Sequence, residues 1–105
     1  METLTVQQIT DLQKQYGLTT MQETINSGLC WTLEGSYGRA AMATLVNGAC
    51  MLPDVPRRDY WGNTVPARTT VKPGSTGSLG NSQDFWQKVI DGEILMDEDV
   101  EEEIM

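Results

Sequence analysis

Two glycine- and serine-rich segments stand before predicted helices, and they are the best candidates for anion binding. The first is 35–39 and the second is 72–82. Backbone amides at the start of a helix can point at an anion, and the helix dipole favours negative charge there. The residues that would make these contacts are Ser36, Arg39, Lys72, Gly77 and Ser82.

Neither segment matches an established phosphate-binding motif. The segment 72–82 lacks the Gly-Lys-Ser/Thr ending of a P-loop, and its glycines lack the spacing and the surrounding βαβ unit of a dinucleotide site. It is equally consistent with an ordinary flexible connection. Arg39, in turn, could pair with Glu34 instead of an external anion. Anion or nucleotide binding therefore stays a hypothesis.

A basic segment with interleaved aromatic residues runs from Arg57 to Lys72. It carries four basic residues against one acidic residue, a local charge of +3, and it includes Arg57, Arg58, Tyr60 and Trp61. Arginine and aromatic side chains are enriched where proteins contact one another, so these four are candidate partner-binding residues. Trp61 could instead fill the core.

The last nine residues form an acidic tail. Six of them are acidic, and the rest of the chain carries only −2 of the formal net charge of −8. The tail could be a solvated end, bind a partner, fold over Arg57 and Arg58, or imitate a nucleic-acid backbone. Direct nucleic-acid binding by the chain is not expected, because basic residues are few and the tail repels phosphates. The candidate partner-binding residues of the tail are Asp97, Glu98, Asp99, Glu101, Glu102 and Glu103.

The chain offers no recognisable catalytic or metal-binding pattern. It has no histidine and two cysteines, Cys30 and Cys50, which are too few for a zinc site. We therefore expect a protein that is not an enzyme and that needs no cofactor. The two thiols could be buried and inert, joined as a disulfide, or reactive.

The sequence also bears on the compartment. No apolar run is long enough to cross a membrane, and the first five residues do not have the form of a secretory signal. We expect the protein to work in the cytoplasm, without membrane contact.

Four short helices are predicted from capping residues and apolar spacing. The first follows a capping box at Thr5-Val6-Gln7-Gln8 and ends at Gly17. The second runs from Thr19 or Thr20 to Gly28. The third follows Ser36, predicted as its cap, and ends at Gly48. The fourth follows Asn81 or Ser82 and ends at Gly92.

The ends of the second and third helices resemble each other. Ile25-Asn26-Ser27-Gly28-Leu29-Cys30 and Leu45-Val46-Asn47-Gly48-Ala49-Cys50 share an aliphatic residue, a glycine and a cysteine at equal spacing. An internal duplication would explain this, and so would the frequent use of glycine at helix ends.

Together these elements predict a small α+β domain spanning residues 1–96, followed by the acidic tail 97–105. A tight antiparallel hairpin is expected at 58–67 because glycine and asparagine in Tyr60–Val65 favour a turn. A short strand is expected at 93–96. The predicted core is Ile9, Leu12, Met21, Ile25, Cys30, Trp31, Leu33, Met42, Leu45, Cys50, Leu52, Phe85, Trp86, Val89 and Ile90, with Trp31 or Trp86 at its centre.

Several stretches between Gly28 and Trp86 resemble short uncharacterised proteins encoded by bacteriophages of gut bacteria. The stretches are Gly35-Ser36-Tyr37-Gly38-Arg39, Gly48-Ala49-Cys50-Met51-Leu52-Pro53, Asp59-Tyr60-Trp61-Gly62-Asn63 and Lys72-Pro73-Gly74. The resemblance implies a phage setting, and so the cytoplasm of a host cell. It carries no activity.

Three functions follow as hypotheses. The first is a phage accessory protein that binds a host protein or complex, for example to inhibit a defence or nucleic-acid-processing system. The second is a protein that binds or sequesters a nucleotide or another small anion. The third is a minor virion or assembly component, for which a homo-oligomer is expected.

Overall fold

Four α-helices and a two-stranded hairpin make up the described part of the chain. The structure is a computed structural model, and it describes residues 3–33 and 35–96. The predicted α+β class is confirmed. The elements in order are α1 (Val6–Gln15), α2 (Thr19–Ser27), the short 3-10 helix η1 (Leu29–Trp31), α3 (Gly35–Asn47), β1 (Arg57–Arg58), β2 (Thr64–Val65) and α4 (Leu79–Ile90).

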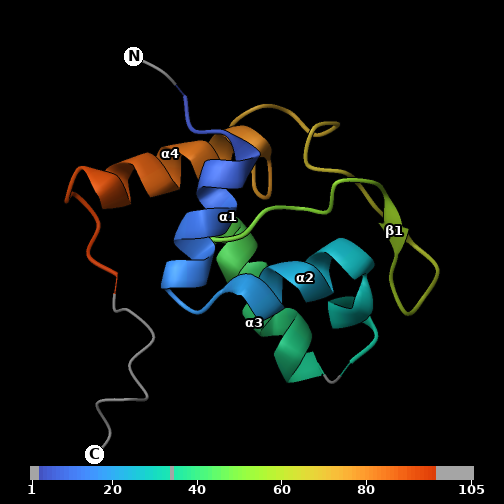
Figure 1. Cartoon of the computed structure of the whole chain (residues 1–105). Coiled ribbons are helices and arrows are strands. Elements are labelled where there is room, and N and C mark those ends of the chain that lie inside the picture. Colours follow the sequence, from blue (N-terminus) through green and yellow to red (C-terminus); the bar gives the residue numbers. More distant parts are fainter. Residues whose placement is uncertain (1–2, 34, 97–105) are drawn as a thin grey trace, which may run out of the picture.

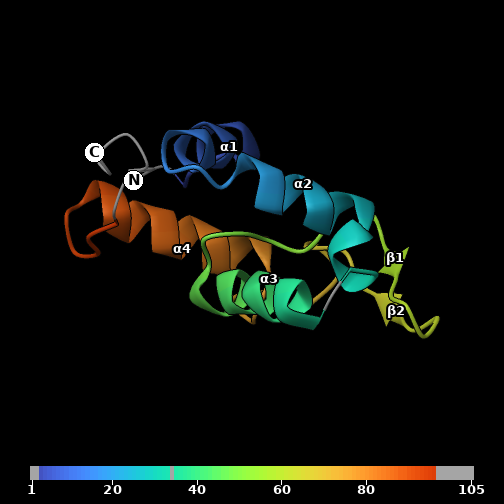
Figure 2. The ribbon, with the colours of Figure 1, turned by 90° about the horizontal axis from the view of Figure 1, so that it is seen from below.

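The helices form two layers with a connecting segment between them. Figure 2 shows α1 and α2 on one side and α3 and α4 on the other. The segment 49–52 passes between these layers and is buried along its whole length. The hairpin lies beside η1, at the end of the molecule opposite the C-terminal end of α4 (Figure 1). Because the hairpin projects from this end, it is free to expose side chains.

Capping chemistry sets the helix boundaries, and two of the predicted boundaries are wrong. The capping box is present, with Gln8 N donating to Thr5 Oγ1 at 3.1 Å and Thr5 N donating to Gln8 Oε1 at 2.8 Å. The third helix already begins at Gly35, so Ser36 lies in its first turn and does not precede it. The fourth begins at Leu79, because the hydroxyl of Ser78 accepts from Asn81 N and caps it there.

The hairpin is shorter than predicted but has the expected antiparallel pairing. Arg57 pairs with Val65 and Arg58 with Thr64. The strand predicted at 93–96 is wrong, because the structure has no strand there. Ile94 and Met96 instead pack as irregular chain against the buried residues of α1 and α4.

The core consists of two apolar clusters. One is centred on Ile25, Leu45 and the two cysteines, and the other on Ile9 and Trp86. Eight of the predicted core residues are buried: Ile9, Ile25, Cys30, Leu45, Cys50, Leu52, Phe85 and Trp86. Four others, Leu12, Met21, Trp31 and Val89, are partly buried and pack against these clusters.

Three predicted core residues are exposed instead. Leu33 and Met42 are 44% and 47% exposed, because they border an open cavity. Ile90 is 52% exposed at the last position of α4, where the Ile9 and Trp86 cluster ends. Of the two centres that the sequence suggested, Trp86 is fully buried, whereas Trp31 is only partly buried and packs against the other cluster.

A buried row of polar side chains ties the layer of α1 and α2 to the connecting segment. Gln13 Nε2 donates to Gln22 Oε1 at 2.8 Å and to Ala49 O at 2.9 Å. Gln22 in turn bonds both backbone groups of Met51, donating to its oxygen and accepting from its nitrogen. These bonds satisfy backbone groups that would otherwise be buried without partners.

The row ends at Arg68, which is only 8% exposed. Its Nη2 donates to Asn26 Oδ1 and its Nε to Leu52 O, each at 2.8 Å. Burial lowers the pKa of the Arg68 guanidinium, and the negative charge of Asp54 partly offsets this effect. Arg68 therefore anchors the chain after the hairpin to α2 and is not available as a surface charge.

Candidate functional site

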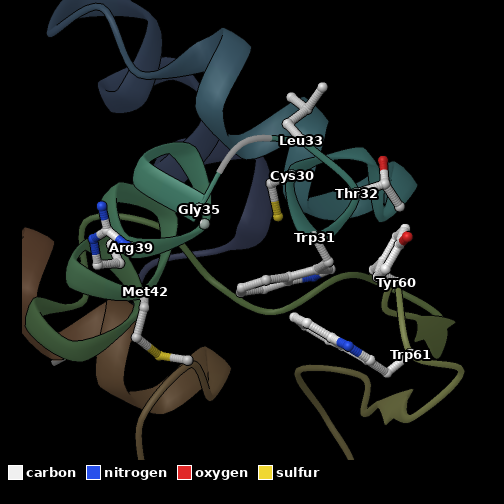
Figure 3. Close-up of a pocket in the computed structure, with 10 residues that line it drawn as sticks. Cys30, Trp31, Thr32, Leu33, Gly35, Arg39, Met42, Tyr60 and Trp61 are labelled. Atoms are coloured by element: carbon white, nitrogen blue, oxygen red, sulfur yellow. The ribbon is translucent and has the colours of Figure 1, made fainter.

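An open, mostly apolar cavity of about 550 Å³ lies between η1, the start of α3 and the hairpin (Figure 3). The Trp31 and Trp61 rings and the Met42 side chain border the same space, with Tyr60 beside Trp61. Arg39 contributes a guanidinium on the α3 side. The cavity therefore combines wide aromatic walls with a positive charge.

A second cavity of about 240 Å³ adjoins the first. Trp31 and Met42 border both, and the second continues toward Leu52 and Val65 beneath the hairpin. Together the two form what we name the aromatic groove. Its defining residues are Trp31, Leu33, Met42, Tyr60 and Trp61.

The tip of the hairpin holds two aromatic side chains in solvent. Tyr60 is 72% and Trp61 78% exposed, and their rings meet edge to face with centroids 5.4 Å apart. The alternative that Trp61 fills the core is wrong. Large exposed aromatic pairs are uncommon on a surface without a contact role.

The backbone of the tip is fixed by Asp59. Its Oδ1 accepts from the backbone nitrogens of Trp61 at 2.9 Å and Asn63 at 2.8 Å. Gly62 takes the left-handed conformation that the turn requires, with φ of 85°. The two aromatic side chains therefore stand on a turn whose shape does not depend on them.

Arg39 lines the first cavity, and two further arginines, Arg57 and Arg58, lie on the hairpin that forms one wall of the groove. Arg57 Nε donates to Asn26 O and Arg58 Nη1 to Gly62 O, each at 2.7 Å, and both side chains are exposed. Among residues 3–33 and 35–96, no carboxylate forms an ion pair with Arg39, Arg57 or Arg58; the ion pair found there joins Lys88 to Asp84. Within these ranges, therefore, none of the three arginines is held in an ion pair.

Trp31 has one unsatisfied polar atom. Its indole Nε1 is buried and has no hydrogen-bond acceptor in the described part of the chain. Such a group is costly to leave without a partner. The missing hydrogen bond therefore lowers the stability that the buried Trp31 ring contributes to the fold.

The two thiols are free, and both are buried in the same cluster. Burial raises the pKa of Cys30 and that of Cys50 to about 11 each. Both are therefore protonated near neutral pH. Of the three alternatives left by the sequence, the structure agrees with the first, in which both thiols are buried and unpaired. Cys30 borders the cavity but is not exposed to solvent.

The candidate anion-binding residues do not gather at one place. Ser36 and Arg39 lie in the first turns of α3, and Arg39 lines the aromatic groove. Lys72 is exposed on the separate loop before α4. Of the candidate anion-binding residues, Arg39 is the one that borders a cavity described above.

Gly77 and Ser82 are occupied by the fold itself. Gly77 is buried, its nitrogen donates to Leu45 O at 3.1 Å, and a Cβ placed on it would lie 2.6 Å from Leu52 Cγ. Ser82 is fully buried inside α4, and its hydroxyl donates to Gly48 O at 2.7 Å. Since α4 begins three residues earlier than Ser82, the predicted placement of Ser82 at a helix start is wrong.

The partner-binding candidates divide in two. Arg57, Arg58, Tyr60 and Trp61 all lie on the hairpin, exposed as a contact role requires. The candidates Asp97, Glu98, Asp99, Glu101, Glu102 and Glu103, as well as Glu34, lie outside the described residues.

The sequence reasoning missed the α3 side of the groove. Met42 borders both cavities and is 47% exposed. Val46, four residues later on the same helix face, is 60% exposed but is not among the residues that line the groove. The small alanines beside Met42 could have signalled a shallow surface instead of a core. Trp31 and Leu33 carried no signal that distinguishes a cavity wall from a core position.

Within 3–33 and 35–96, no group of three or more histidine, cysteine, aspartate or glutamate residues is placed to hold a metal ion. No helix in the described ranges is long and apolar enough to cross a membrane.

Comparison with known proteins yields one partial match. Residues 9–55 match the family model of a domain of unknown function, DUF7417. The match covers somewhat less than half of the 105 residues, from α1 to the segment before the hairpin. No curated protein matches, and no solved structure matches. The matched part thus includes Trp31, Arg39 and Met42, and the hairpin lies beyond it.

Proposed function

We propose that this protein is a non-enzymatic binding module that holds a segment of a partner protein in the aromatic groove. The observation that carries the proposal is the exposed Tyr60 and Trp61 pair beside a cavity of about 550 Å³. Tryptophan, tyrosine and arginine are enriched among the residues that dominate the energetics of protein interfaces. Tryptophan and tyrosine bury large areas with few rotatable bonds.

The charges around the groove favour an acidic partner segment. Arg39 lines the first cavity, Arg57 and Arg58 lie on the hairpin that forms one wall of the groove, and no described carboxylate forms an ion pair with any of them. We name these three arginines the basic rim. Positive charge of this kind speeds association with a negatively charged partner and slows association with a positively charged one. The preferred ligand is therefore a segment with apolar side chains flanked by aspartate or glutamate.

The phage setting implied by the sequence resemblance gives this role a context. In that setting the partner would be a protein or complex of the host cytoplasm. Occupying a host surface could inhibit a defence or nucleic-acid-processing system without any chemistry. This context rests on the resemblance, whereas the binding role rests on the groove.

The test compares two doubly substituted full-length proteins in affinity capture from host lysate, with and without added salt. Tyr60→Ala/Trp61→Ala removes the tip, and Ile90→Ala/Leu95→Ala removes two exposed apolar side chains at the opposite end, where Leu95 is 91% exposed. We expect the tip variant to lose the captured partner and the control to keep it. Equal capture by both variants would overturn the proposal.

A small ligand is the second candidate, favoured by the volume of the cavity. Small-molecule sites measure about 300–1,000 Å³ and are mostly apolar with a few polar groups. A flat aromatic anion could stack on Trp61 and pair with Arg39. Native mass spectrometry of the full chain tests this: a retained small mass that Arg39→Ala abolishes would favour the ligand over the protein partner.

A further inference from the structure

The aromatic groove and the C-terminal tail are complementary in charge and in apolar content. The groove has aromatic walls and is lined by Arg39, and Arg57 and Arg58 lie on the hairpin that forms one wall; no described carboxylate forms an ion pair with any of the three. The tail, residues 97–105, has six carboxylates, with Val100 between them and Ile104 and Met105 after them. It is the same kind of segment that the groove is suited to hold. Opposite charges around an apolar contact give both orientation and affinity.

The place where the tail leaves the fold keeps it away from its own groove. Ile94 and Met96 pack against the Ile9 and Trp86 cluster, beyond the C-terminal end of α4. Both ribbon views place that end of α4 opposite the hairpin (Figures 1 and 2). Nine residues reach at most about 30 Å when fully extended. Much of that reach would be used in passing the body of its own molecule.

A second copy removes this obstacle, because it can present its groove directly beside the tail. We infer that residues 97–105 of one copy occupy the aromatic groove of another, so that the protein assembles with itself by tail exchange. This inference rests on the proposed role of the groove as a polypeptide-binding site. Each copy has one tail and one groove, so reciprocal exchange closes a symmetric dimer with two equivalent contacts.

The central experiment uses two full-length variants with reversed charges. Arg39→Glu/Arg58→Glu makes the rim acidic, and Glu101→Lys/Glu102→Lys/Glu103→Lys makes the tail basic. Lys14→Glu/Lys88→Glu changes the net charge as the rim variant does, but on α1 and α4, and serves as the matched control. Molecular mass is measured by sedimentation over a range of protein concentrations at low and high salt.

We expect the wild-type chain and the control to form dimers that weaken as salt rises. Each reversed-charge variant should be monomeric alone, since its tail and groove then carry like charges. An equimolar mixture of the two variants should regain dimers, because the acidic rim of one accepts the basic tail of the other. A monomeric wild type, variants that still dimerise alone, or a mixture that stays monomeric would each overturn the inference.

Trp61→Ala keeps the test decisive if the rim variant fails to fold, as judged by circular dichroism. Trp61 is exposed, so its removal leaves the core intact, and we expect at least tenfold weaker dimerisation. Unchanged dimerisation would overturn tail binding in this groove.

Partner capture separates this inference from the proposed function. If the wild type is monomeric but the hairpin-tip variant loses a captured protein, tail exchange fails and the binding role stands. If tail exchange is present and no other protein depends on the tip, the groove serves assembly and a foreign partner is excluded.

Discussion

Gln13 Nε2 donates to Gln22 Oε1 at 2.8 Å inside the protein, and this bond joins α1 to α2 where both face the buried segment 49–52. Both partners in this hydrogen bond are neutral side chains. Each glutamine also forms a hydrogen bond with the backbone of that segment. The pair therefore fixes the position of the connecting segment relative to both helices.

Replacing Gln22 with leucine should strongly destabilise the protein. The change leaves the nitrogen and oxygen of Met51 without their partners, and it also removes an acceptor from Gln13. We expect the free energy of unfolding to fall by about 2–4 kcal/mol. Urea denaturation measures it. Gln7→Leu, on the exposed face of α1, is the control and should change stability by less than about 0.5 kcal/mol.

Two glycines with similar backbone angles should respond differently to alanine. Gly48 has φ of 97°, and a Cβ there would lie 2.7 Å from Phe85 Cβ and 2.8 Å from Asn81 O. Gly62 has φ of 85°, with nothing within 4 Å. We expect Gly62→Ala to cost about 1 kcal/mol and Gly48→Ala at least about 2 kcal/mol more. Equal melting temperatures for the two variants would contradict the close packing at Gly48.

The thiols should resist alkylation until the protein unfolds. Burial raises the pKa of Cys30 and of Cys50 from 9.0 to about 11 each. Thiolate, the reactive form, is therefore scarce at pH 8. Iodoacetamide should label neither thiol in the native state and both in denaturant, as counted by mass spectrometry. Rapid native labelling of either cysteine would contradict this placement.

The same pKa shifts predict how stability depends on pH. The folded state holds these two protons more tightly than the unfolded state, so their contribution is fully present below pH 9 and is lost between about pH 9 and 11. Urea midpoints measured across this range should fall. A Cys30→Ala/Cys50→Ala variant, less stable throughout, should show a smaller fall.

Substitutions of Trp61 and Trp86 should affect stability very differently, because the two side chains differ in exposure. Trp61 is 78% exposed and Trp86 fully buried. Trp61→Ala should leave stability nearly unchanged, whereas Trp86→Ala should cost about 3–5 kcal/mol. Acrylamide should quench the wild type more strongly than Trp61→Phe, and thermal melts give the stability difference. Strong destabilisation by Trp61→Ala would mean that the hairpin tip supports the fold.

Local chemistry made the helices and the hairpin predictable. The capping box at Thr5 and the glycine ends at Gly28 and Gly48 involve residues close in sequence, so their effects can be read directly. The sequence predicts a start of α4 three or four residues too late, because Ser78 and Ser82 are equally good caps in isolation. The choice depends on Gly48, whose carbonyl takes the Ser82 hydroxyl from the other side of the fold.

The groove and the buried polar row were beyond sequence reasoning for the same reason. An apolar residue such as Met42 is predicted to lie in the core whenever it falls on the apolar face of a helix. Met42 is exposed because a cavity separates this face of α3 from the hairpin. Arg68 reads as a surface charge, yet its acceptors are supplied by Asn26 and Leu52 from distant parts of the chain. Hydrogen bonds across such separations leave no pattern in the sequence.

The Asp59 turn has a consequence for how this protein can change over time. The Asp59 carboxylate fixes the loop by accepting hydrogen bonds from the backbone nitrogens of Trp61 and Asn63. The side chains at positions 60 and 61 are therefore not needed to shape the loop. Substitutions at these two positions can alter what is recognised while the scaffold is conserved. Natural variation or a combinatorial library can therefore change the binding specificity of the tip, and most of the resulting variants should still fold.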